Sequence, residues 1–329
     1  MEKSLIIPKK LQRGNEIRVI APSMSLSIVS KKNQEYANDF FEKYGFRLSF
    51  GKYVEECDLF KSASIASRIA DLHDAFADPS VDAILAVIGG SNATQLLNQI
   101  DYDLIKANPK ILCGYSDITA LNTAIYTKTK LVTYSGAHYS TFAMQKGLDY
   151  TKDYFFKCLM RTTPFEIIPS NKWSDDAWYL DQENRTFYKN DGPLILQPGT
   201  AEGVIVGANI AIFTNLKGTE YFPSLKDKII FLEDDAIAGP ASFDEFDRML
   251  HSLTYHPEFQ YIKGLMIGRF PKIAKVTDEH LKKSINCKSI PKEIPIIANL
   301  DFGHTTPIFT FPIGGKAKIE QNKITITEH

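Results

Sequence analysis

The first half of the chain alternates between short apolar runs and amphipathic stretches. Residues 83–88 form a continuous apolar run that ends at Gly89-Gly90, which is typical of a strand buried on both faces. Residues 65–76 carry apolar side chains at spacings of three and four, which predicts a helix. Repeated strand–helix units of this kind indicate a parallel sheet with right-handed crossovers. The pattern also predicts strands at 16–23, 46–50, 111–114 and 131–134, and helices at about 31–44 and 117–127.

Residues 161–200 interrupt this alternation. They hold both tryptophans, several prolines and many Asp and Asn residues, and a connection this long is usually a lid, a binding loop or a linker. We therefore expect three parts: a domain at 1–160, a connecting loop that contacts substrate at 161–200, and a second domain at 201–329. The last part shows helical patterns at about 242–253 and 278–285, and strands at 203–206, 229–232, 264–267, 294–298 and a terminal pair, 309–313 and 317–319.

Composition and charge narrow the class of protein. The 329 residues are 44% hydrophobic and 23% charged, as in globular proteins, and the formal net charge of −1 excludes a generally basic nucleic-acid binder. No apolar run approaches the roughly 18 residues that span a bilayer, and we find no secretory signal. The cysteines form no Cys-x-x-Cys pair, which argues against a zinc knuckle or a disulfide framework. We expect a cytoplasmic protein without metal, cofactor, membrane or nucleic-acid partner.

Ligands of parallel sheets bind at the carboxyl ends of the strands, so polar residues there are the first candidates for chemistry. The segment Gly114 to Asp117 follows a buried strand and delivers Ser116 to a strand-to-helix turn, which resembles the geometry of a nucleophile elbow. The backbone N–H of Asp117 would point to where an oxyanion forms. The motif departs from Gly-x-Ser-x-Gly because Ile118 replaces the second glycine. The alternative is that Ser116 only caps the helix.

A glycine pair marks a second strand end. Gly89 and Gly90 allow close backbone approach, so this turn could donate to an oxyanion or hold a substrate. The alternative is a plain strand-to-helix turn. The spacing is neither that of a dinucleotide fingerprint nor that of a phosphate-binding loop, so nucleotide-cofactor binding is not indicated.

Two further strand ends carry an acid and a base. Glu233, Asp234 and Asp235 follow one apolar run, and His304 follows another, with His138 as the rival base. One acid could orient a catalytic histidine, or the acids together with His304 could bind a divalent metal. The alternatives without catalysis are that the acids form a solvated turn and that the histidine is structural. A nucleophile, an acid and a base at three strand ends favour a Ser–Glu–His triad of Ser116, Glu233 and His304.

The chain resembles the LD-carboxypeptidase family of serine peptidases, and within it the branch of microcin C immunity proteins. The segments that carry the resemblance span nearly the whole chain: 87–90, 101–105, 114–120, 173–176, 181–187, 203–209, 230–234 and 299–307. The resemblance implies a triad of Ser116, Glu233 and His304, and an oxyanion hole formed by the amides of Gly90 and Asp117. It also implies an α/β fold, with a flavodoxin-like parallel-sheet N-terminal domain and a smaller C-terminal α/β domain with a barrel-like β core, usually as a homodimer.

Two departures from the family pattern bear on the substrate. Ala208 stands where the family often has the second glycine of Gly-Gly-Asn, and Ser91 begins a stretch that is commonly led by an aromatic residue. In the resembling immunity branch an aromatic residue of the 161–200 loop stacks on the nucleotide, and Trp178 is the nearer match. We expect Trp178, Trp173, Asn209 and Ser91 to contact substrate.

The combined expectation is a serine peptidase that cleaves the amide bond of aminoacyl-nucleotides of the microcin C type. The first alternative is a muramoyltetrapeptide LD-carboxypeptidase, which acts on a small murein peptide. The second is a binding module that holds a small ligand without turnover, and the third is a metal hydrolase that uses Glu233, Asp234, Asp235 and His304. For the tryptophans, the alternative is that they only cap the core between the domains.

Overall fold

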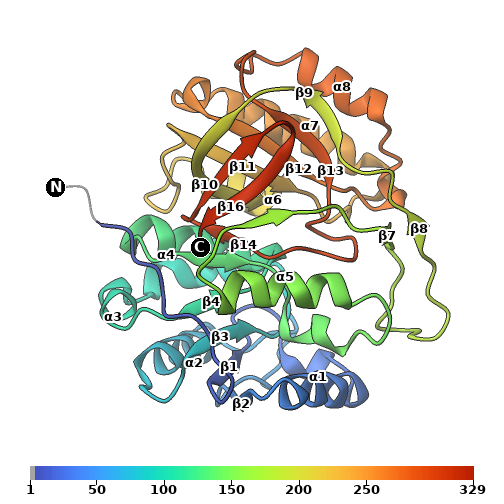
Figure 1. The fold of residues 1–329 in the computed structure, drawn as a ribbon. Coiled ribbons are helices and arrows are strands. Elements are labelled where there is room, and N and C mark those ends of the chain that lie inside the picture. The colour runs from blue at the N-terminus through green and yellow to red at the C-terminus, as the bar shows by residue number, and fades with distance from the viewer. Residues whose placement is uncertain (1–3) are drawn as a thin grey trace.

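Two β-sheets divide the molecule into a lower and an upper half in Figure 1. The computed structural model describes residues 4–329. The lower half holds the N-terminal sheet and its helices, and the upper half holds the second sheet. The expected α/β class, with a parallel-rich N-terminal sheet and a second C-terminal part, is confirmed.

The first sheet has the flavodoxin-like strand order 2-1-3-4-5, extended by one late strand. Its first five strands run parallel, and the late strand pairs antiparallel with β5. Its members in spatial order are β14 (Phe311–Ile313), β5 (Thr133–Ser135), β4 (Ile111–Cys113), β3 (Ala83–Ala86), β1 (Glu16–Ile20) and β2 (Arg47–Phe50).

Helices cover both faces of this sheet, because its central strands are apolar on both sides. In β3, Leu85 packs into one core with Phe41, and Ile84 packs into the opposite core with Leu72. These residues explain why the pattern at 83–88 shows no alternation. The helices of this half are α1 (Lys31–Lys43), α2 (Ile65–Ala77), α3 (Tyr102–Ala107), α4 (Thr119–Thr129) and α5 (Asp149–Met160).

The second sheet surrounds the core of the upper half, where Phe231 of its centre is fully buried. Four of its strands, β10 to β13, are parallel. Its helices are α6 (Ile210–Asn215), α7 (Ser242–Thr254) and α8 (Asp278–Asn286). The strands in spatial order are β6 (Phe165–Ile167), β16 (Lys323–Glu328), β15 (Lys316–Glu320), β10 (Ala201–Asn209), β11 (Lys228–Glu233), β12 (Gly264–Gly268), β13 (Ile296–Leu300) and β9 (Leu194–Gln197).

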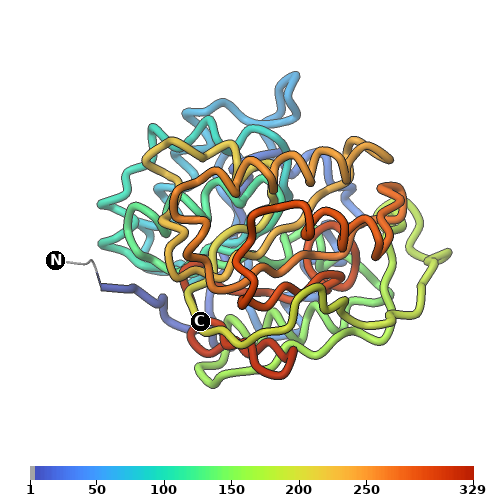
Figure 2. Tube along the Cα trace, turned by 90° about the horizontal axis from the view of Figure 1, so that it is seen from above, coloured from blue at the N-terminus to red at the C-terminus, as the bar shows by residue number. Residues whose placement is uncertain are grey.

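The segment 161–200 is less irregular than its sequence indicates. It contributes β6 and β9 to the edges of the second sheet and forms a separate hairpin of β7 (Lys172–Trp173) and β8 (Tyr188–Lys189). Strands of two to four residues are too short to show a periodic pattern. In Figure 2 this yellow-green segment runs along the edge of the molecule beside the red C-terminal strands.

The prediction that the last strands, 309–313 and 317–319, form a pair is wrong. Strands form in both regions, but β14 joins the first sheet beside β5, whereas β15 pairs with β10 and β16 in the second. The chain therefore returns to the N-terminal half after it has contributed most strands of the second sheet. Hydrophobic patterning predicts a strand but not its neighbour, because pairing depends on residues far away in the sequence.

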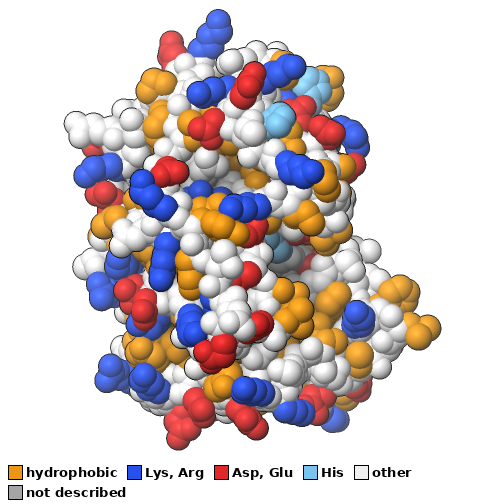
Figure 3. All heavy atoms as spheres, turned by 90° about the vertical axis from the view of Figure 1, so that its right-hand side faces the viewer, with side chains coloured by type: hydrophobic (Ala, Val, Ile, Leu, Met, Phe, Trp, Pro, Cys, Tyr) orange, Lys and Arg blue, Asp and Glu red, His pale blue; other side chains and the backbone are white. Residues whose placement is uncertain are grey.

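The outer surface carries both signs of charge. Lys and Arg side chains are interspersed with Asp and Glu over the face in Figure 3. Within residues 4–329, every helix is too short or too polar to cross a bilayer.

Candidate active site

The turn after β4 holds Ser116 in a conformation that few side chains adopt. Ser116 is the first residue of a short 3-10 helix, Ser116–Ile118, and its φ of 61° lies in the left-handed region. The neighbouring turn comes very close, because a Cβ atom on Gly89 would lie 2.8 Å from the Ser116 Cβ. Glycine at position 89 therefore lets the two strand ends meet, and the serine side chain projects at the carboxyl edge of the sheet.

Ser116, His304 and Glu233 form one hydrogen-bonded chain. The His304 Nε2 lies 3.0 Å from the Ser116 Oγ, and its Nδ1 lies 2.7 Å from the Glu233 Oε2. Glu233 ends β11 and is 2% exposed, while His304 lies in the loop between β13 and β14. That loop passes close to the acid, because a Cβ on Gly303, at φ 102°, would lie 2.7 Å from the Glu233 Oε2. The structure thus brings together three residues that the sequence places at separate strand ends.

The surrounding acids favour the protonated form of His304. Burial lowers the pKa of His304, but attraction to Glu233, supported by Asp235 and Asp234, outweighs it and raises the net pKa above the ordinary histidine value. In the neutral ring, an Nδ1–H that donates to Glu233 leaves the Nε2 lone pair free to accept the Ser116 proton. This arrangement suits general-base chemistry.

The two acids after Glu233 accept hydrogen bonds from the backbone of their own turn. The Asp234 Oδ1 accepts from the Ala236 N–H at 2.8 Å, and the Asp235 Oδ1 accepts from the Ile237 N–H at 3.0 Å. Burial raises the pKa of Asp234 to about 6. Among residues 4–329, no three His, Cys, Asp or Glu side chains are grouped so as to hold a metal ion.

The rival base, His138, contacts Tyr115, the residue before the serine. Its Nε2 is 2.9 Å from the Tyr115 carbonyl oxygen, and its ring stacks on the Tyr115 ring at 4.2 Å between centroids. Burial lowers the pKa of His138 to about 3. The Tyr115 ring in turn lies 5.3 Å from the His304 ring. His138 therefore supports the turn that carries Ser116, and His304 is the histidine that contacts the serine.

The carboxylate of Asp117 joins the two turns that carry the predicted oxyanion amides. Its Oδ2 accepts from the Asn92 N–H at 2.9 Å, the Ala93 N–H at 2.8 Å and the Ser23 hydroxyl at 2.6 Å. Asp117 is 1% exposed, so these bonds are shielded from water. The Gly90 turn and the Ser116 turn are thereby held in one fixed relation.

The residues expected to contact substrate lie in different environments. Asn209 ends β10 beside Glu233, and its side chain caps α6 by accepting from the Ile212 N–H at 3.2 Å. Ser91 is exposed on the Gly90 turn. Their proximity to the strand ends agrees with the expected position, and their contact with substrate stays a prediction.

The two tryptophans differ in their packing. The Trp173 ring lies 5.1 Å from the Arg269 guanidinium, 5.9 Å from the Lys272 ammonium and 5.1 Å from the Tyr188 ring. Trp178 is half-buried against the core of the N-terminal half. Both tryptophans are partly exposed, and the three partners of Trp173 fit a packing role at least as well as a binding role.

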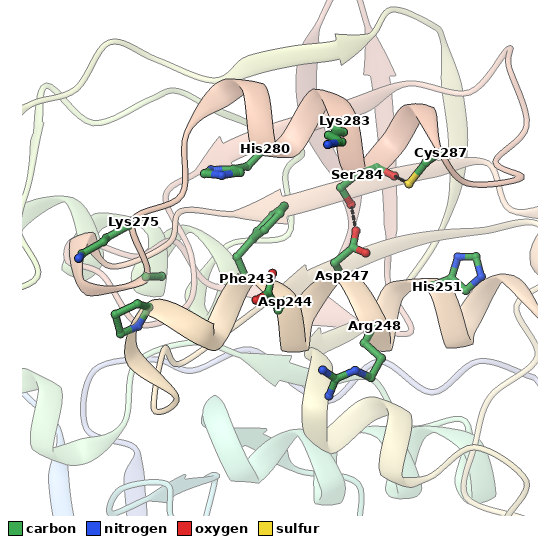
Figure 4. Close-up of a pocket in the computed structure, with 12 residues that line it drawn as sticks. Phe243, Asp244, Asp247, Arg248, His251, Lys275, His280, Lys283, Ser284 and Cys287 are labelled. Atoms are coloured by element: carbon green, nitrogen blue, oxygen red, sulfur yellow. Dashed lines mark hydrogen bonds between the residues drawn. The ribbon is translucent and has the colours of Figure 1, made fainter.

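A cavity of about 770 Å³ lies away from this site, between α7 and α8 (Figure 4). Phe243 of α7 and His280 of α8 project into it, and Asp247 accepts a hydrogen bond from Ser284 across it. It holds none of the residues of the hydrogen-bonded chain, and its Cys287 Sγ is engaged with the Ser284 carbonyl. Its size alone does not make it the centre of the chemistry.

The sequence pattern predicts no role for several polar side chains around the site. Tyr115 and Arg185 lie in segments that carry the family resemblance, 114–120 and 181–187, but their contacts with His304 and Thr306 depend on residues far away in the sequence. Arg269 lies outside those segments, and its local signal is its partner Asp301, which lies in the same segment as His304.

Two family models match the chain. The model of the LD-carboxypeptidase N-terminal domain matches residues 17–136, and that of the LD-carboxypeptidase C-terminal domain matches residues 202–319.

Similar sequences align over nearly the whole length. Putative carboxypeptidase YocD of Bacillus subtilis (strain 168) is 50% identical, over 97% of this chain and 99% of that protein. A probable murein peptide carboxypeptidase of the same organism is 31% identical, over 94% and 90% of the two chains. The microcin C7 self-immunity protein MccF of Escherichia coli is 30% identical, over 98% and 96%.

Solved structures share the fold. An MccF-like protein from Bacillus anthracis str. Ames superposes with a TM-score of 0.97 at 53% identity, covering 98% of this chain and 100% of that one. MccF in complex with glutamyl sulfamoyl guanosine superposes with a TM-score of 0.87 at 29% identity, covering 98% of both. With both parts matched and relatives aligned from end to end, the chain belongs to the LD-carboxypeptidase family and is a peptidase.

Proposed function

We propose that this peptidase uses Ser116 as its nucleophile, His304 as its general base and Glu233 as the group that orients the base. The observation that carries the proposal is the hydrogen-bonded chain of 3.0 Å and 2.7 Å through the two nitrogens of His304. The Ser116 Oγ attacks the carbonyl carbon while its proton passes to the His304 Nε2. His304 then protonates the leaving amine, and water releases the acyl group from Ser116 by the same steps in reverse order.

The amides of Gly90 and Asp117 stabilise the oxyanion in this proposal. Each such donor contributes about 3–4 kcal/mol to transition-state stabilisation in a comparable hydrolase. The fixed relation between the two turns, made by the Asp117 carboxylate, supports this role. A donor pair that needs no rearrangement during the reaction is the most effective kind.

For the substrate, we propose an aminoacyl-nucleotide of the microcin C type, with cleavage of its amide bond. MccF, a relative over 98% of this chain, is named as a microcin C7 self-immunity protein, and its structures include complexes with glutamyl sulfamoyl guanosine and aspartyl sulfamoyl adenosine. Trp178 supplies a half-buried aromatic ring next to the N-terminal core. Stacking on a base is worth about 1–3 kcal/mol.

A murein tetrapeptide is the second candidate substrate. Its support is the probable murein peptide carboxypeptidase, which at 31% identity is as similar to this chain as MccF is. The two candidates share the same proposed Ser116 chemistry and differ in the substrate groups that Trp178, Trp173, Asn209 and Ser91 would contact. The peptidase family of the chain argues against the other alternative, a binding module without turnover.

Labelling by a fluorophosphonate probe tests the nucleophile. The Ser116 Oγ bonds to phosphorus, fluoride leaves, and His304 takes the hydroxyl proton. We expect rapid labelling of the wild type and none of Ser116→Ala, with both proteins folded by circular dichroism. Equal labelling of Ser116→Ala would exclude Ser116, and a folded wild type that neither reacts nor cleaves either substrate would refute the proposed triad chemistry.

A direct comparison of substrates tests the specificity. We expect the wild type to cleave glutamyl sulfamoyl adenosine faster than murein tetrapeptide, and Trp178→Ala to raise the KM for the nucleotide about 10- to 100-fold, as loss of stacking implies. Trp178→Phe, which keeps an aromatic face, should retain most of the affinity. Release of D-alanine from the tetrapeptide that is unaffected by Trp178→Ala, without cleavage of the nucleotide, would instead establish the murein substrate.

The remaining expectations belong to the same proposal. The division at residues 1–160, 161–200 and 201–329, the homodimer and the cytoplasmic location stay predictions. Size-exclusion chromatography with light scattering measures the oligomer directly.

A further inference from the structure

The loop that carries His304 has little regular structure of its own. It runs from the end of β13 to the start of β14 and lies between the two halves of the molecule. Its main-chain closure is a single bond from the Phe309 N–H to the Asp301 carbonyl at 2.8 Å. A base that must stay within hydrogen-bond reach of Ser116 therefore needs support from elsewhere.

A first buried anchor lies three residues before His304. The Asp301 carboxylate, on a residue 3% exposed, accepts from the Arg269 guanidinium at 3.2 Å and from the Ser170 N–H at 2.8 Å. The same Arg269 Nη2 donates to the Asn190 side-chain oxygen at 2.7 Å. Asp301 thus connects the loop to Arg269, which directly follows β12. Through the same contacts it is connected to Ser170 and Asn190, at the two ends of the hairpin region 170–190.

A second anchor lies two residues after His304. Thr306 and Ser174 exchange two backbone hydrogen bonds of 2.7 Å and 2.8 Å. The Arg185 side chain, 1% exposed, bonds to the Asp176 carboxylate at 2.6 Å, the Thr306 hydroxyl at 3.2 Å and the Lys146 carbonyl at 2.7 Å. Arg185 therefore connects the segment 161–200, the loop of His304 and the N-terminal half at one point.

A contribution to folding stability does not by itself explain why Arg185 and Arg269 are buried. Burying two charges has a desolvation cost that commonly cancels their attraction, so a buried ion pair contributes little net stability. At Asp301 burial is the largest influence, and it raises the pKa despite the neighbouring Ser170 N–H and Arg269, which shows that the ionised form is disfavoured there. What a buried, multiply bonded arginine does supply is a fixed geometry.

We propose that Arg185 and Arg269 are positioning residues that hold the His304 loop at Ser116 by clamping it to the 161–200 segment on both sides. The inference rests on the proposed function and extends it, because it makes the connecting segment part of the support of the base. A contact made by a substrate on this segment is then transmitted to the base through two rigid anchors. Neither arginine contacts the reacting atoms.

The test measures the rate of fluorophosphonate labelling of the full chain as a function of pH. Arg185→Met keeps the unbranched stem of the side chain but removes its charge and all three donors. We expect about 100-fold slower labelling at neutral pH, because a displacement of about 1 Å costs that much. We also expect the apparent pKa of the profile to fall toward about 6.5, because His304 moves away from Glu233. Arg185→Lys, which keeps the charge near Asp176, should recover part of the rate.

Arg18→Met is the matched control. Arg18 is a half-buried arginine of β1 with two carboxylate partners, Glu16 at 3.2 Å and Asp78 at 3.0 Å, on the opposite side of the first sheet from β14. Its loss removes comparable ion pairs without touching the His304 loop, so the labelling rate and the apparent pKa should stay at their wild-type values.

The outcomes separate the two proposals. If the wild type is not labelled, the proposed function fails. If the wild type is labelled and folded Arg185→Met matches it in rate and in apparent pKa, the positioning role is wrong while the nucleophile stands. Should Arg185→Met not fold, Asp301→Asn, which keeps an oxygen for the Ser170 N–H but weakens the bond to Arg269, is measured in the same way and must show the same two changes.

Discussion

The two sides of the candidate site are built by different means. Ser116 follows a strand that is buried in a parallel sheet, and the helix after it is buried nearly all round. His304 lies in a loop that is held by two backbone hydrogen bonds to Ser174 and by ion pairs of Arg185 and Arg269 on its two flanks. The proposed nucleophile is positioned mainly by regular secondary structure, and the proposed base is positioned by a network of polar contacts.

This difference has consequences for how each side responds to mutation. The position of a strand end in a packed sheet changes little when one side chain is altered, because many other contacts hold it in place. A loop held by a few hydrogen bonds loses its geometry when one partner is removed, and the partner left behind is an uncompensated buried charge. On the side of His304, removal of one partner should therefore lower activity and stability together.

The largest effect is expected for His304→Ala. It should lower kcat about 10⁴- to 10⁶-fold, and Ser116→Ala/His304→Ala should be no worse than Ser116→Ala alone, because members of one catalytic unit are not additive. His138→Ala should be less damaging to kcat and should mainly lower the melting temperature, since His138 is buried behind Tyr115. A harmful His138→Ala together with a harmless His304→Ala would reverse the assignment of the base.

Glu233→Gln comes next, with an expected loss of about 10⁴-fold in kcat. The wild-type kcat/KM should rise with pH through an apparent pKa above about 6.5, because the acids raise the pKa of His304 and only its neutral form accepts the proton. Removal of the Glu233 charge leaves the effect of burial, so the apparent pKa should move to lower pH in the variant. An unchanged profile would mean that another group limits the rate.

The smallest effect on activity is expected for Asp117→Ala, which affects the nucleophile side. It leaves the Asn92 and Ala93 N–H groups without their acceptor, at a cost of about 1–3 kcal/mol in unfolding free energy for each donor. The kcat should fall about 10-fold, less than the loss of a whole oxyanion donor. As a control, Asp101→Ala removes the acceptor of the Leu104 N–H at the start of α3 and should cost only about 1 kcal/mol, with no change in kcat. A larger loss of kcat in Asp117→Ala than in Arg185→Met would contradict the contrast between the two sides.

Much of the N-terminal half could be predicted from the sequence because its elements are long or strongly patterned. The apolar run at 83–88 and the helix near 65–76 correspond to β3 and α2 within a few residues. The sequence pattern does not predict α3 and α6, which have six residues each and show too little periodicity. It also does not predict α5, although that helix has twelve residues. The hairpin of β7 and β8 is not predicted either, because strands of two residues show no alternation.

For the candidate site, the sequence by itself determined which residue types stand at which strand ends. A strand that ends in a glycine or serine turn is a local property, and so Ser116, Glu233 and His304 could be singled out one at a time. Only the tertiary structure decided that they meet, because 188 residues separate Ser116 from His304 and their distance depends on how two sheets pack. It also decided that β14 returns to the first sheet and that two buried arginines flank the base. Such contacts depend on partners far apart in the chain, so no local pattern of residues can specify them.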